Sequence, residues 1–174
     1  MSKLELIQGS CVRQAADVIV NAANRYLAHG AGVCGQIFES AGPDKLAKAC
    51  SKYPTPLNDG NAVITPSFDL TNAKAIIHAV GPDFNNTPKA FKELFDAYYT
   101  SLVVMKENGY HSIAFPLISS GIFGGNLPRK CAESAKQCRR AYQRFVSDYP
   151  DYDIEVTLCA LKPEEYSEAK EEIT

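Results

Sequence analysis

The chain lacks an apolar run long enough to cross a membrane, which would need roughly 18 residues. Its longest apolar stretches lie at 15–16, 18–20 and 73–80, and Lys74 and His78 interrupt the last of these. Residues 1–5 contain no apolar core of the kind that a secretory signal needs. We therefore expect a cytoplasmic protein without a membrane partner.

A basic excess is also missing, because 18 lysines and arginines stand against 20 aspartates and glutamates, a formal net charge of −2. Proteins that bind nucleic-acid duplexes are usually basic, since neutralising phosphates supplies much of their affinity. The two tight basic pairs, at 129–130 and 139–140, fall in a predicted helix, where a solvated face explains them. The composition argues against a nucleic-acid partner and leaves only a short single strand open.

The six cysteines form no C-x-x-C pair and match no zinc-binding spacing. They are Cys11, Cys34, Cys50, Cys131, Cys138 and Cys159. We expect no metal site, and we expect reduced, buried thiols, as is usual in a reducing cytoplasm. Cys34 is set apart from this expectation because it directly follows a glycine-rich loop.

The composition is that of an ordinary globular protein. Of the 174 residues, 45% are hydrophobic and 22% are charged, which excludes a wholly disordered or fibrous chain. No repeat, low-complexity tract or shift of composition divides the sequence. Residues 1–174 are therefore predicted to form a single domain.

Apolar patterning predicts strands that alternate with helices. The predicted strands cover residues 4–7, 17–21, 60–66, 75–80, 112–118 and 154–161. The predicted helices cover residues 33–41, 44–53, 88–108, 126–149 (capped by Asn126) and 163–172. Such alternation is typical of an α/β sheet with helices on both faces. Ligands bind to these sheets beyond the carboxyl ends of the strands, which selects the loops after Val20 and Ile118.

The first selected loop, within residues 21–35, is rich in glycine and leads into a predicted helix. Gly30 and Gly32 allow the backbone to approach a ligand closely and to take positive φ. Unpaired N–H groups and the positive end of the helix make an anion site there, and phosphate is the usual ligand. A tight turn without a ligand is the alternative, because many glycine-rich loops are only turns.

The second selected loop, residues 119–125, also follows a predicted strand and precedes a predicted helix. Two such loops at one sheet edge can hold a pyrophosphate from opposite sides, and structural turns seldom occur in facing pairs. Neither loop contains the lysine of G-x-x-x-x-G-K-[ST] or fits G-x-G-x-x-G with a matching downstream acid. These absences argue against a nucleoside triphosphatase and an ordinary dinucleotide dehydrogenase.

The segment VIVNAANRYLAHGAGVCGQIFESAG at 18–42 resembles the signature of the macrodomain family, whose members bind ADP-ribose. NAVITPSFDL, AIIHAVGPDF and PLISSGIFGGNLP follow in the family's order, and the resemblance extends over residues 4–172. It implies a three-layer α/β/α fold with a central mixed β-sheet. The histidine in the first loop is most similar to the bacterial and viral hydrolytic branch, which removes mono-ADP-ribose from acidic side chains of proteins. The implied partner is ADP-ribose, free or attached to a protein, without a cofactor, and we expect a monomer.

The resemblance assigns catalytic roles to Asn24, His29, Gly32 and Phe123. Asn24 matches the asparagine that hydrogen-bonds the distal ribose, a task that suits an amide because it both donates and accepts. An asparagine that only ties down its own turn is the alternative. His29 matches a position near the distal ribose, or is simply a solvent-exposed loop histidine. Gly32 presents its backbone to the ligand, and Phe123 packs against the distal ribose, caps the core, or does both.

A wider set of positions is implied in ligand binding. Gly30 and Ala31 are expected to present their backbone to the diphosphate and the distal ribose, although the family often has glycine in place of Ala31. The remaining positions of the two loops are Ala22, Val33, Ser119, Ser120, Gly121 and Ile122. Asn21 is interpreted as a structural residue.

Some of the implied ligand-binding positions depart from the family pattern. Cys34 stands where strong hydrolases of the family carry aspartate. A thiol at a helix N-terminus can have a depressed pKa, but without an evident partner base we interpret Cys34 as a small packing residue in preference to a nucleophile. Ser10 and Cys11 stand where an aspartate usually accepts a hydrogen bond from adenine, and Leu161 stands where an aromatic ring often covers it. These changes predict weaker or altered recognition of the base.

The implied reaction is hydrolysis of the bond between the anomeric carbon of the distal ribose and an acyl oxygen, with oxocarbenium character. No pair of carboxylates is evident, so we expect a phosphate oxygen to position or deprotonate water while Asn24 and the loop amides fix the sugar. Processing of Appr-1''-p belongs to the same expected chemistry. The rival interpretations are a reader that binds ADP-ribose without turnover, a deacetylase of O-acetyl-ADP-ribose, and a protein that binds adenine-rich single-stranded RNA.

Overall fold

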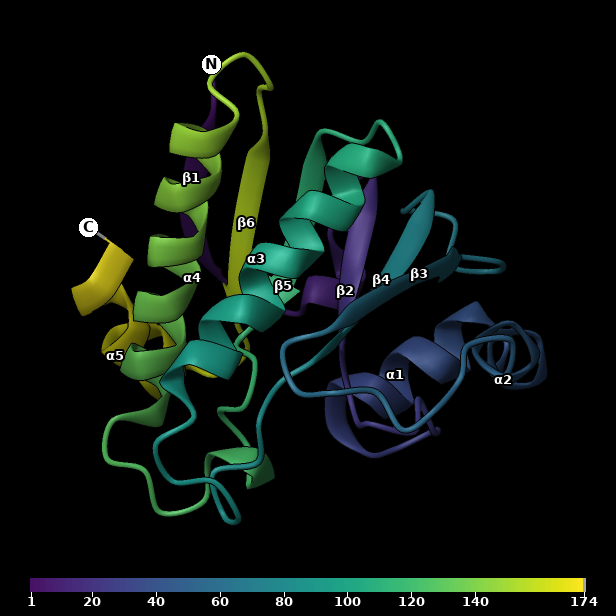
Figure 1. The fold of residues 1–174 in the computed structure, drawn as a ribbon, viewed down its shortest axis with the longest axis horizontal. Coiled ribbons are helices and arrows are strands. Elements are labelled where there is room, and N and C mark those ends of the chain that lie inside the picture. The colour runs from purple at the N-terminus through teal and green to yellow at the C-terminus, as the bar shows by residue number, and fades with distance from the viewer. Residues whose placement is uncertain (174) are drawn as a thin grey trace.

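Six strands form one sheet in the order β1-β6-β5-β2-β4-β3 in the computed structural model, which describes residues 1–173 (Figure 1). The strands are β1 (Lys3–Gln8), β2 (Val18–Ala23), β3 (Ala62–Pro66), β4 (Ala75–Val80), β5 (Ser112–Pro116) and β6 (Glu155–Ala160). β3 runs antiparallel to β4, and the other pairings are parallel. The predicted mixed sheet is therefore confirmed.

Helices cover both faces of the sheet, α1 and α2 on one face and α3, α4 and α5 on the other (Figure 1). The α-helices are α1 (Gly32–Ala41), α2 (Pro43–Cys50), α3 (Phe91–Glu107), α4 (Lys130–Asp148) and α5 (Pro163–Ile173), and the 3-10 helices are η1 (Cys11–Arg13) and η2 (Ile122–Gly124). Within residues 1–173, no helix combines the length and the apolar character that crossing a bilayer requires. This arrangement confirms the predicted three-layer α/β/α fold.

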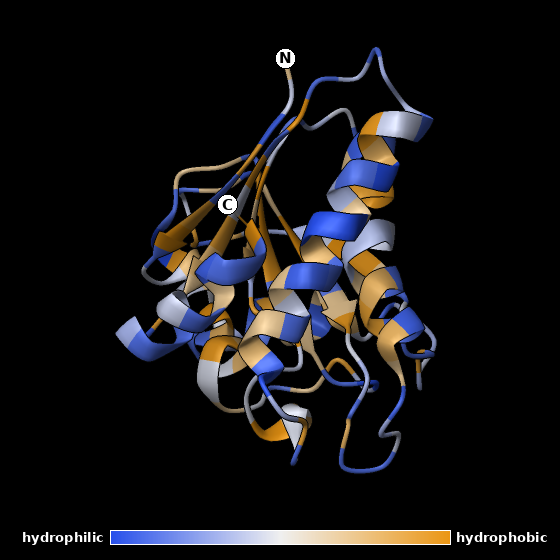
Figure 2. Ribbon diagram, turned by 90° about the vertical axis from the view of Figure 1, so that its left-hand side faces the viewer, coloured by the Kyte–Doolittle hydropathy of each residue, from blue (hydrophilic) through white to orange (hydrophobic). Residues whose placement is uncertain are grey.

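The central strands are buried on both faces. Every residue of β4 is buried, and β2 is buried except at Ala22. Parallel strands that are covered on both sides consist of nearly continuous apolar residues, which is why these segments stand out in the sequence. Figure 2 shows hydrophobic residues along the strands and hydrophilic residues on the outer sides of the helices. Two buried clusters result, one around Tyr98 and Phe115 and the other around Phe38 and Leu46.

The predicted start of the fourth helix at Asn126 is wrong, because α4 begins at Lys130. Pro128 disfavours helical backbone at the residue before it. Arg129 then takes a left-handed φ of 52° at the N-cap. The chain therefore passes through an irregular segment between the second selected loop and α4.

Other element ends differ from the prediction by a few residues. The third helix begins at Phe91 instead of 88, the second ends at Cys50 instead of 53, and β3 begins at Ala62 instead of 60. β5 ends at Pro116, before the predicted end at Ile118. The Ile118 N–H donates instead to the hydroxyl oxygen of Tyr98 at 2.9 Å, so the chain leaves the strand ladder there.

His78 lies on β4 in the interior of the molecule and is completely buried. Its Nδ1 is 3.1 Å from Nδ2 of Asn21 on β2, and its Nε2 is 2.9 Å from the hydroxyl oxygen of Thr65 on β3. An amide nitrogen only donates, so Nδ1 accepts and the ring proton lies on Nε2, facing Thr65. Burial lowers the pKa of His78 to about 4, and the ring is therefore neutral at neutral pH.

We predict a loss of stability at mildly acidic pH that depends on His78. An unfolded histidine takes up a proton with a pKa of about 6.5, whereas the buried ring stays neutral until the pH nears its folded pKa of about 4. Between these values the unfolded state binds more protons, so lowering the pH from 7 to 5 should reduce the free energy of unfolding by about 2 kcal/mol. Urea unfolding at both pH values should show this loss in the wild type and a smaller loss in His78→Gln.

His111→Gln is the matched control, because His111 is exposed. This variant should lose as much stability as the wild type between the two pH values. A His78→Gln protein with the full wild-type loss would contradict the prediction.

Candidate functional site

The loops after β1, β6, β5, β2 and β4 all leave from one edge of the sheet. These strands are mutually parallel, so their carboxyl ends point the same way, toward the lower edge in Figure 1. β2 lies between β4 and β5, which puts the first selected loop in the middle of this edge. The second selected loop follows β5, the strand beside β2. The two loops therefore start from neighbouring strands.

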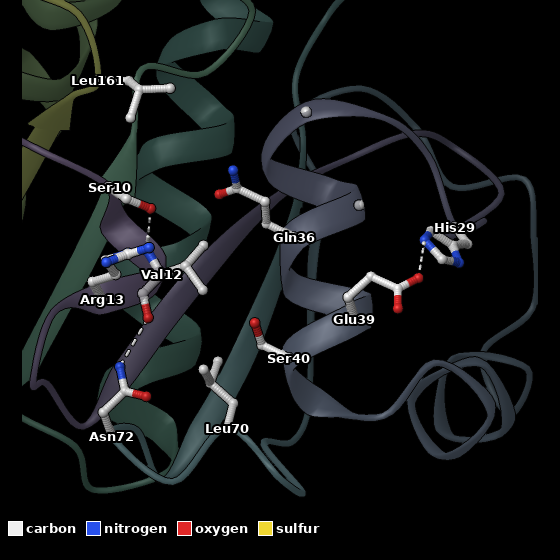
Figure 3. A pocket seen from close by; sticks show the side chains of 12 residues that line it. Ser10, Val12, Arg13, His29, Gln36, Glu39, Ser40, Leu70, Asn72 and Leu161 are labelled. Atoms are coloured by element: carbon white, nitrogen blue, oxygen red, sulfur yellow. Dashed lines mark hydrogen bonds and ion pairs between the residues drawn. The ribbon is translucent and has the colours of Figure 1, made fainter.

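A pocket of about 980 Å³ lies at this edge, alongside α1 (Figure 3). Its lining residues are Ser10, Val12, Arg13, His29, Gly32, Gly35, Gln36, Glu39, Ser40, Leu70, Asn72 and Leu161. Four of the predicted site residues, namely Ser10, His29, Gly32 and Leu161, are thus brought to one cavity. The second loop is not part of this lining.

Ser10 and Leu161 come together because β1 and β6 are neighbours and end at the same level. Ser10 caps η1, where its Oγ accepts the Val12 N–H at 3.3 Å. Leu161 is 51% exposed and offers an apolar surface to the pocket. Cys11 turns into the core, with its Sγ 3.8 Å from the carbonyl oxygen of Val20. The thiol of Cys11 therefore belongs to the packed interior.

Asn24 holds the first loop in shape. Its Oδ1 accepts the N–H groups of Tyr26 and Ala28, each at 3.0 Å. Its Nδ2 donates to the carbonyl oxygen of Ala28, also at 3.0 Å. Since an amide nitrogen carries two hydrogens, one remains for a ligand. The structure thus shows that Asn24 stabilises the turn, and its remaining hydrogen is compatible with the predicted binding of a ribose.

Cys34, in the first turn of α1, also contacts the first loop. Its Sγ donates to the carbonyl oxygen of Ala28 at 3.5 Å, and the side chain is buried. Burial raises the pKa of the Cys34 thiol, and hydrogen bonds from the Gly30 backbone and the Asn21 side chain oppose this shift only in part. The thiol is therefore protonated at neutral pH. This environment agrees with the interpretation of Cys34 as a packing residue.

The amino end of α1 faces the pocket with open N–H groups. The first N–H groups of a helix have no partner within the helix. Ala31 provides no side-chain cap, and the first turn contains no acidic residue. Gly32 has a φ of 60°, and an added Cβ would meet nothing within 4 Å, so glycine is favoured there by conformation and not by space. The positive end of the helix is left without a neutralising group.

His29 lies against α1 at the rim of the pocket. Its ring stacks on Phe38 at a centroid distance of 4.8 Å, and its Nε2 is 3.6 Å from the carboxylate of Glu39. Figure 3 shows the ring facing Glu39, on the side of α1 away from Ser10 and Leu161. The structure thus gives His29 two partners on α1 that the sequence analysis did not identify.

The second loop offers its main chain and not its hydroxyls. The hydroxyl of Ser119 donates to the carbonyl oxygen of Pro82, and that of Ser120 to the carbonyl oxygen of Leu117, both at 2.7 Å. Within residues 1–173, the N–H groups of Gly121, Ile122 and Phe123 donate to no other group. These three N–H groups are the donors that this loop leaves unpaired among the described residues.

The expectation that the second loop leads directly into a helix is wrong. The loop itself contains the 3-10 turn of η2, and α4 begins only at Lys130, after the irregular segment 126–129. The N–H of Ala132, in the first turn of α4, donates to Glu168 on α5 at 3.0 Å. The amino end of α4 therefore faces α5. The Lys130 side chain extends to the second loop, where its Nζ donates to the carbonyl oxygen of Gly121 at 3.1 Å.

Part of the pocket lining was not identified from the sequence. Gln36, Glu39 and Ser40 are spaced by three and four residues on α1, so they share a helix face. The helix predicted at 33–41 already contained that signal. Arg13 and Asn72 had none, because η1 was not predicted and Asn72 joins it from a segment remote in the sequence.

Ala22 and Val33 are half-buried, at the end of β2 and in the first turn of α1. All six cysteines are free and buried, as predicted for the five other than Cys34. Among the residues that the structure describes, no three His, Cys, Asp or Glu side chains gather in a way that could hold a metal ion.

Comparison with known proteins identifies the family of this chain and proteins that share its fold. The sequence model of the Macro domain family matches residues 20–135. An O-acetyl-ADP-ribose deacetylase of Cronobacter turicensis is 45% identical over 128 residues, 70% of this chain and 70% of the relative. One of Salmonella gallinarum is 40% identical over 151 residues, 85% of this chain and 82% of the relative.

Solved macrodomain structures have the same fold as this chain. An Oceanobacillus iheyensis macrodomain with ADP superposes with a TM-score of 0.86 at 32% identity, covering 98% of this chain and 90% of that chain. A Trypanosoma brucei macrodomain in complex with ADP-ribose superposes with a TM-score of 0.82 at 25% identity, covering 97% of this chain and 68% of that chain.

We predict that Cys34 does not react as a free nucleophile. Because the thiol is buried and its pKa is raised, iodoacetamide at pH 8 should modify it on the order of 100-fold more slowly in the folded protein than in urea. Mass spectrometry of the digested protein measures the modification of each cysteine. Rapid modification of Cys34 in the folded protein, with the other cysteines protected, would refute this prediction.

Proposed function

Since this chain belongs to the Macro domain family, we propose that it binds ADP-ribose at the carboxyl edge of its sheet and hydrolyses an acyl ester at the distal ribose. The first substrate candidate is O-acetyl-ADP-ribose, because the relatives from Cronobacter turicensis and Salmonella gallinarum are named as deacetylases of it. The observation that carries the proposal is the amino end of α1, which has no acidic residue in its first turn and borders a large pocket.

The proposed ligand lies along the edge in one direction. Adenine occupies the end of the pocket formed by Ser10 and Leu161, where the apolar surface of Leu161 covers one face of the base. The diphosphate receives N–H groups from the start of α1, a common anion site, and from Gly121–Phe123 of the second loop. This order leaves the distal ribose at Asn24, whose Nδ2 retains one hydrogen for a sugar hydroxyl.

The proposed hydrolysis relies on positioning. Water adds to the acyl carbon, the bond between this carbon and the ribose oxygen breaks, and acetate and ADP-ribose are released. Neither loop contains an aspartate or glutamate, and Cys34 is a neutral thiol, so a two-carboxylate mechanism and a thiolate nucleophile are both disfavoured. A diphosphate oxygen held by the loop amides is placed to orient water or take its proton, while Asn24 fixes the sugar.

A second candidate substrate is a protein that carries mono-ADP-ribose on an acidic side chain. This linkage is also an ester between a carboxylic acid and the distal ribose. Its hydrolysis needs the same fixed sugar, with water placed at the anomeric carbon, from which the carboxylate leaves. The exposure of the second loop favours it, because Ile122 is 85% exposed and a bulky acceptor would meet little obstruction there. Binding without turnover, as in a reader module, is the outcome that the assays below separate from both.

We predict that Asn24→Ala lowers kcat for O-acetyl-ADP-ribose by about 100-fold, because a sugar that is no longer fixed rarely meets the positioned water. Release of acetate measures turnover, and calorimetry with ADP-ribose measures affinity, which should fall far less than kcat. Asn108→Ala is the matched control, because Asn108 is an exposed asparagine at the carboxyl end of α3, bonded to the Val104 carbonyl oxygen.

The same pair of measurements separates the candidates. Wild-type protein that binds ADP-ribose but releases neither acetate nor ADP-ribose from a glutamate-modified protein is a reader, and the hydrolase proposal then fails. Wild-type protein that does not bind ADP-ribose at all would overturn the proposed function as a whole.

A further inference from the structure

A continuous line of polar contacts connects the interior of the sheet with Asn24. It begins at the Thr65 hydroxyl, which is 2.9 Å from Nε2 of His78, and continues from Nδ1 of His78 to Nδ2 of Asn21 at 3.1 Å. The Asn21 side chain in turn acts on the thiol of Cys34, whose pKa it lowers against the effect of burial. Thr65, His78, Asn21 and Cys34 are all buried and lie on β3, β4, β2 and α1.

The line reaches the proposed site through a single carbonyl group. The carbonyl oxygen of Ala28 accepts both the Cys34 thiol at 3.5 Å and Nδ2 of Asn24 at 3.0 Å. This contact points one hydrogen of the Asn24 amide nitrogen at Ala28. Because the amide is planar, the direction of the second hydrogen is then fixed as well. Any shift of Ala28 would turn the hydrogen that Asn24 offers to a ribose hydroxyl.

Stability alone does not account for the amide at position 21. Asn21 is 1% exposed, and its Oδ1 finds no hydrogen-bond partner within residues 1–173. A buried acceptor without a partner costs free energy, whereas an apolar side chain of similar size would pack there without that cost. The pairing of β2 with β4 does not need the side-chain contact either, since six residue pairs already join the two strands.

We propose that Asn21 and His78 are positioning residues for the reaction, which act through Cys34 and Ala28 to hold the Asn24 side chain toward the distal ribose. This inference rests on the proposed function. His78 is the anchor, because its neutral ring accepts from Asn21 on one side and donates to Thr65 on the other. Asn21 transmits the orientation, because its side chain bonds His78 on one side and acts on the Cys34 thiol on the other.

A double-mutant cycle tests this inference, with Asn21→Leu and Asn24→Ala as the two changes. Asn21→Leu alone should lower kcat by about 10-fold and change KM by less than about 2-fold. In the Asn24→Ala background the same change should have no further effect on kcat, because the group that it positions is already absent. Gln137→Met, another buried amide replaced by an apolar side chain but on α4, controls for the loss of a buried polar group and should leave kcat unchanged.

Conservative replacement of His78 supplies a second readout. His78→Gln keeps an acceptor and a donor in this place and should retain most of the turnover, whereas His78→Leu keeps neither and should match Asn21→Leu. A purely structural role would instead make both His78 variants follow their loss of stability. If Asn21→Leu does not fold, Asn21→Ser replaces it in the cycle, since it removes the amide with a smaller change in polarity.

The outcomes separate this inference from the proposed function. An equal loss of kcat from Asn21→Leu in the wild-type and Asn24→Ala backgrounds would overturn the positioning role while turnover itself stands. Wild-type protein without turnover would overturn the hydrolase proposal first. If Asn21→Leu has normal activity and shows no coupling to Asn24→Ala, the line of polar contacts serves only the fold, and the positioning role is overturned.

Discussion

The site depends on the parallel pairing of β2 with β4 on one side and with β5 on the other. This pairing brings two loops from distant parts of the sequence to neighbouring positions on one edge. It also makes the segment after β4 a support for the second loop, since Ser119 donates to the carbonyl oxygen of Pro82 at 2.7 Å. Gly81 is required there, because an added Cβ would lie 2.4 Å from the Ile118 side chain. The conformation of the second loop is therefore set by the sheet as much as by its own glycines.

The order of strands and helices could be predicted because each buried element carries a local signal. Continuous apolar residues mark β2 and β4, and helical spacing of apolar residues marks α3. The start of α4 could not be placed in this way, because the backbone at Pro128 and Arg129 overrides a favourable capping residue at Asn126. Positions within the site show the same division. The backbone role of Gly32 follows from local chemistry, whereas the partners of His29 and Cys34 depend on how α1 packs beside the loop.

Cys34 illustrates how a position can change its chemistry and keep its place. An ionised carboxylate there could only accept hydrogen bonds, whereas a protonated thiol donates one. In this chain the thiol donates, because Cys34 Sγ faces the carbonyl oxygen of Ala28. The backbone of Gly30 hydrogen-bonds the same sulfur atom. The thiol therefore serves the geometry of the first loop, and in the proposed hydrolysis the chemical step is left to groups that this loop positions. This role of Cys34 fits the proposed hydrolysis, in which water and the ligand supply most of the reacting groups.

An acidic chain can hold a diphosphate because the relevant charge is local. The net charge is −2, yet residues 24–33 and 119–125 contain no aspartate or glutamate. Arg25, the arginine of the first loop, is engaged with Asp59 at 3.0 Å, and Arg13 lines the pocket beside Ser10 (Figure 3). At the two loops, main-chain N–H groups supply the positive potential, and they lose no side-chain rotamer freedom when a ligand binds. Fixed donors of this kind select an anion by the direction of its oxygens, without the basic surface that would also attract nucleic acid.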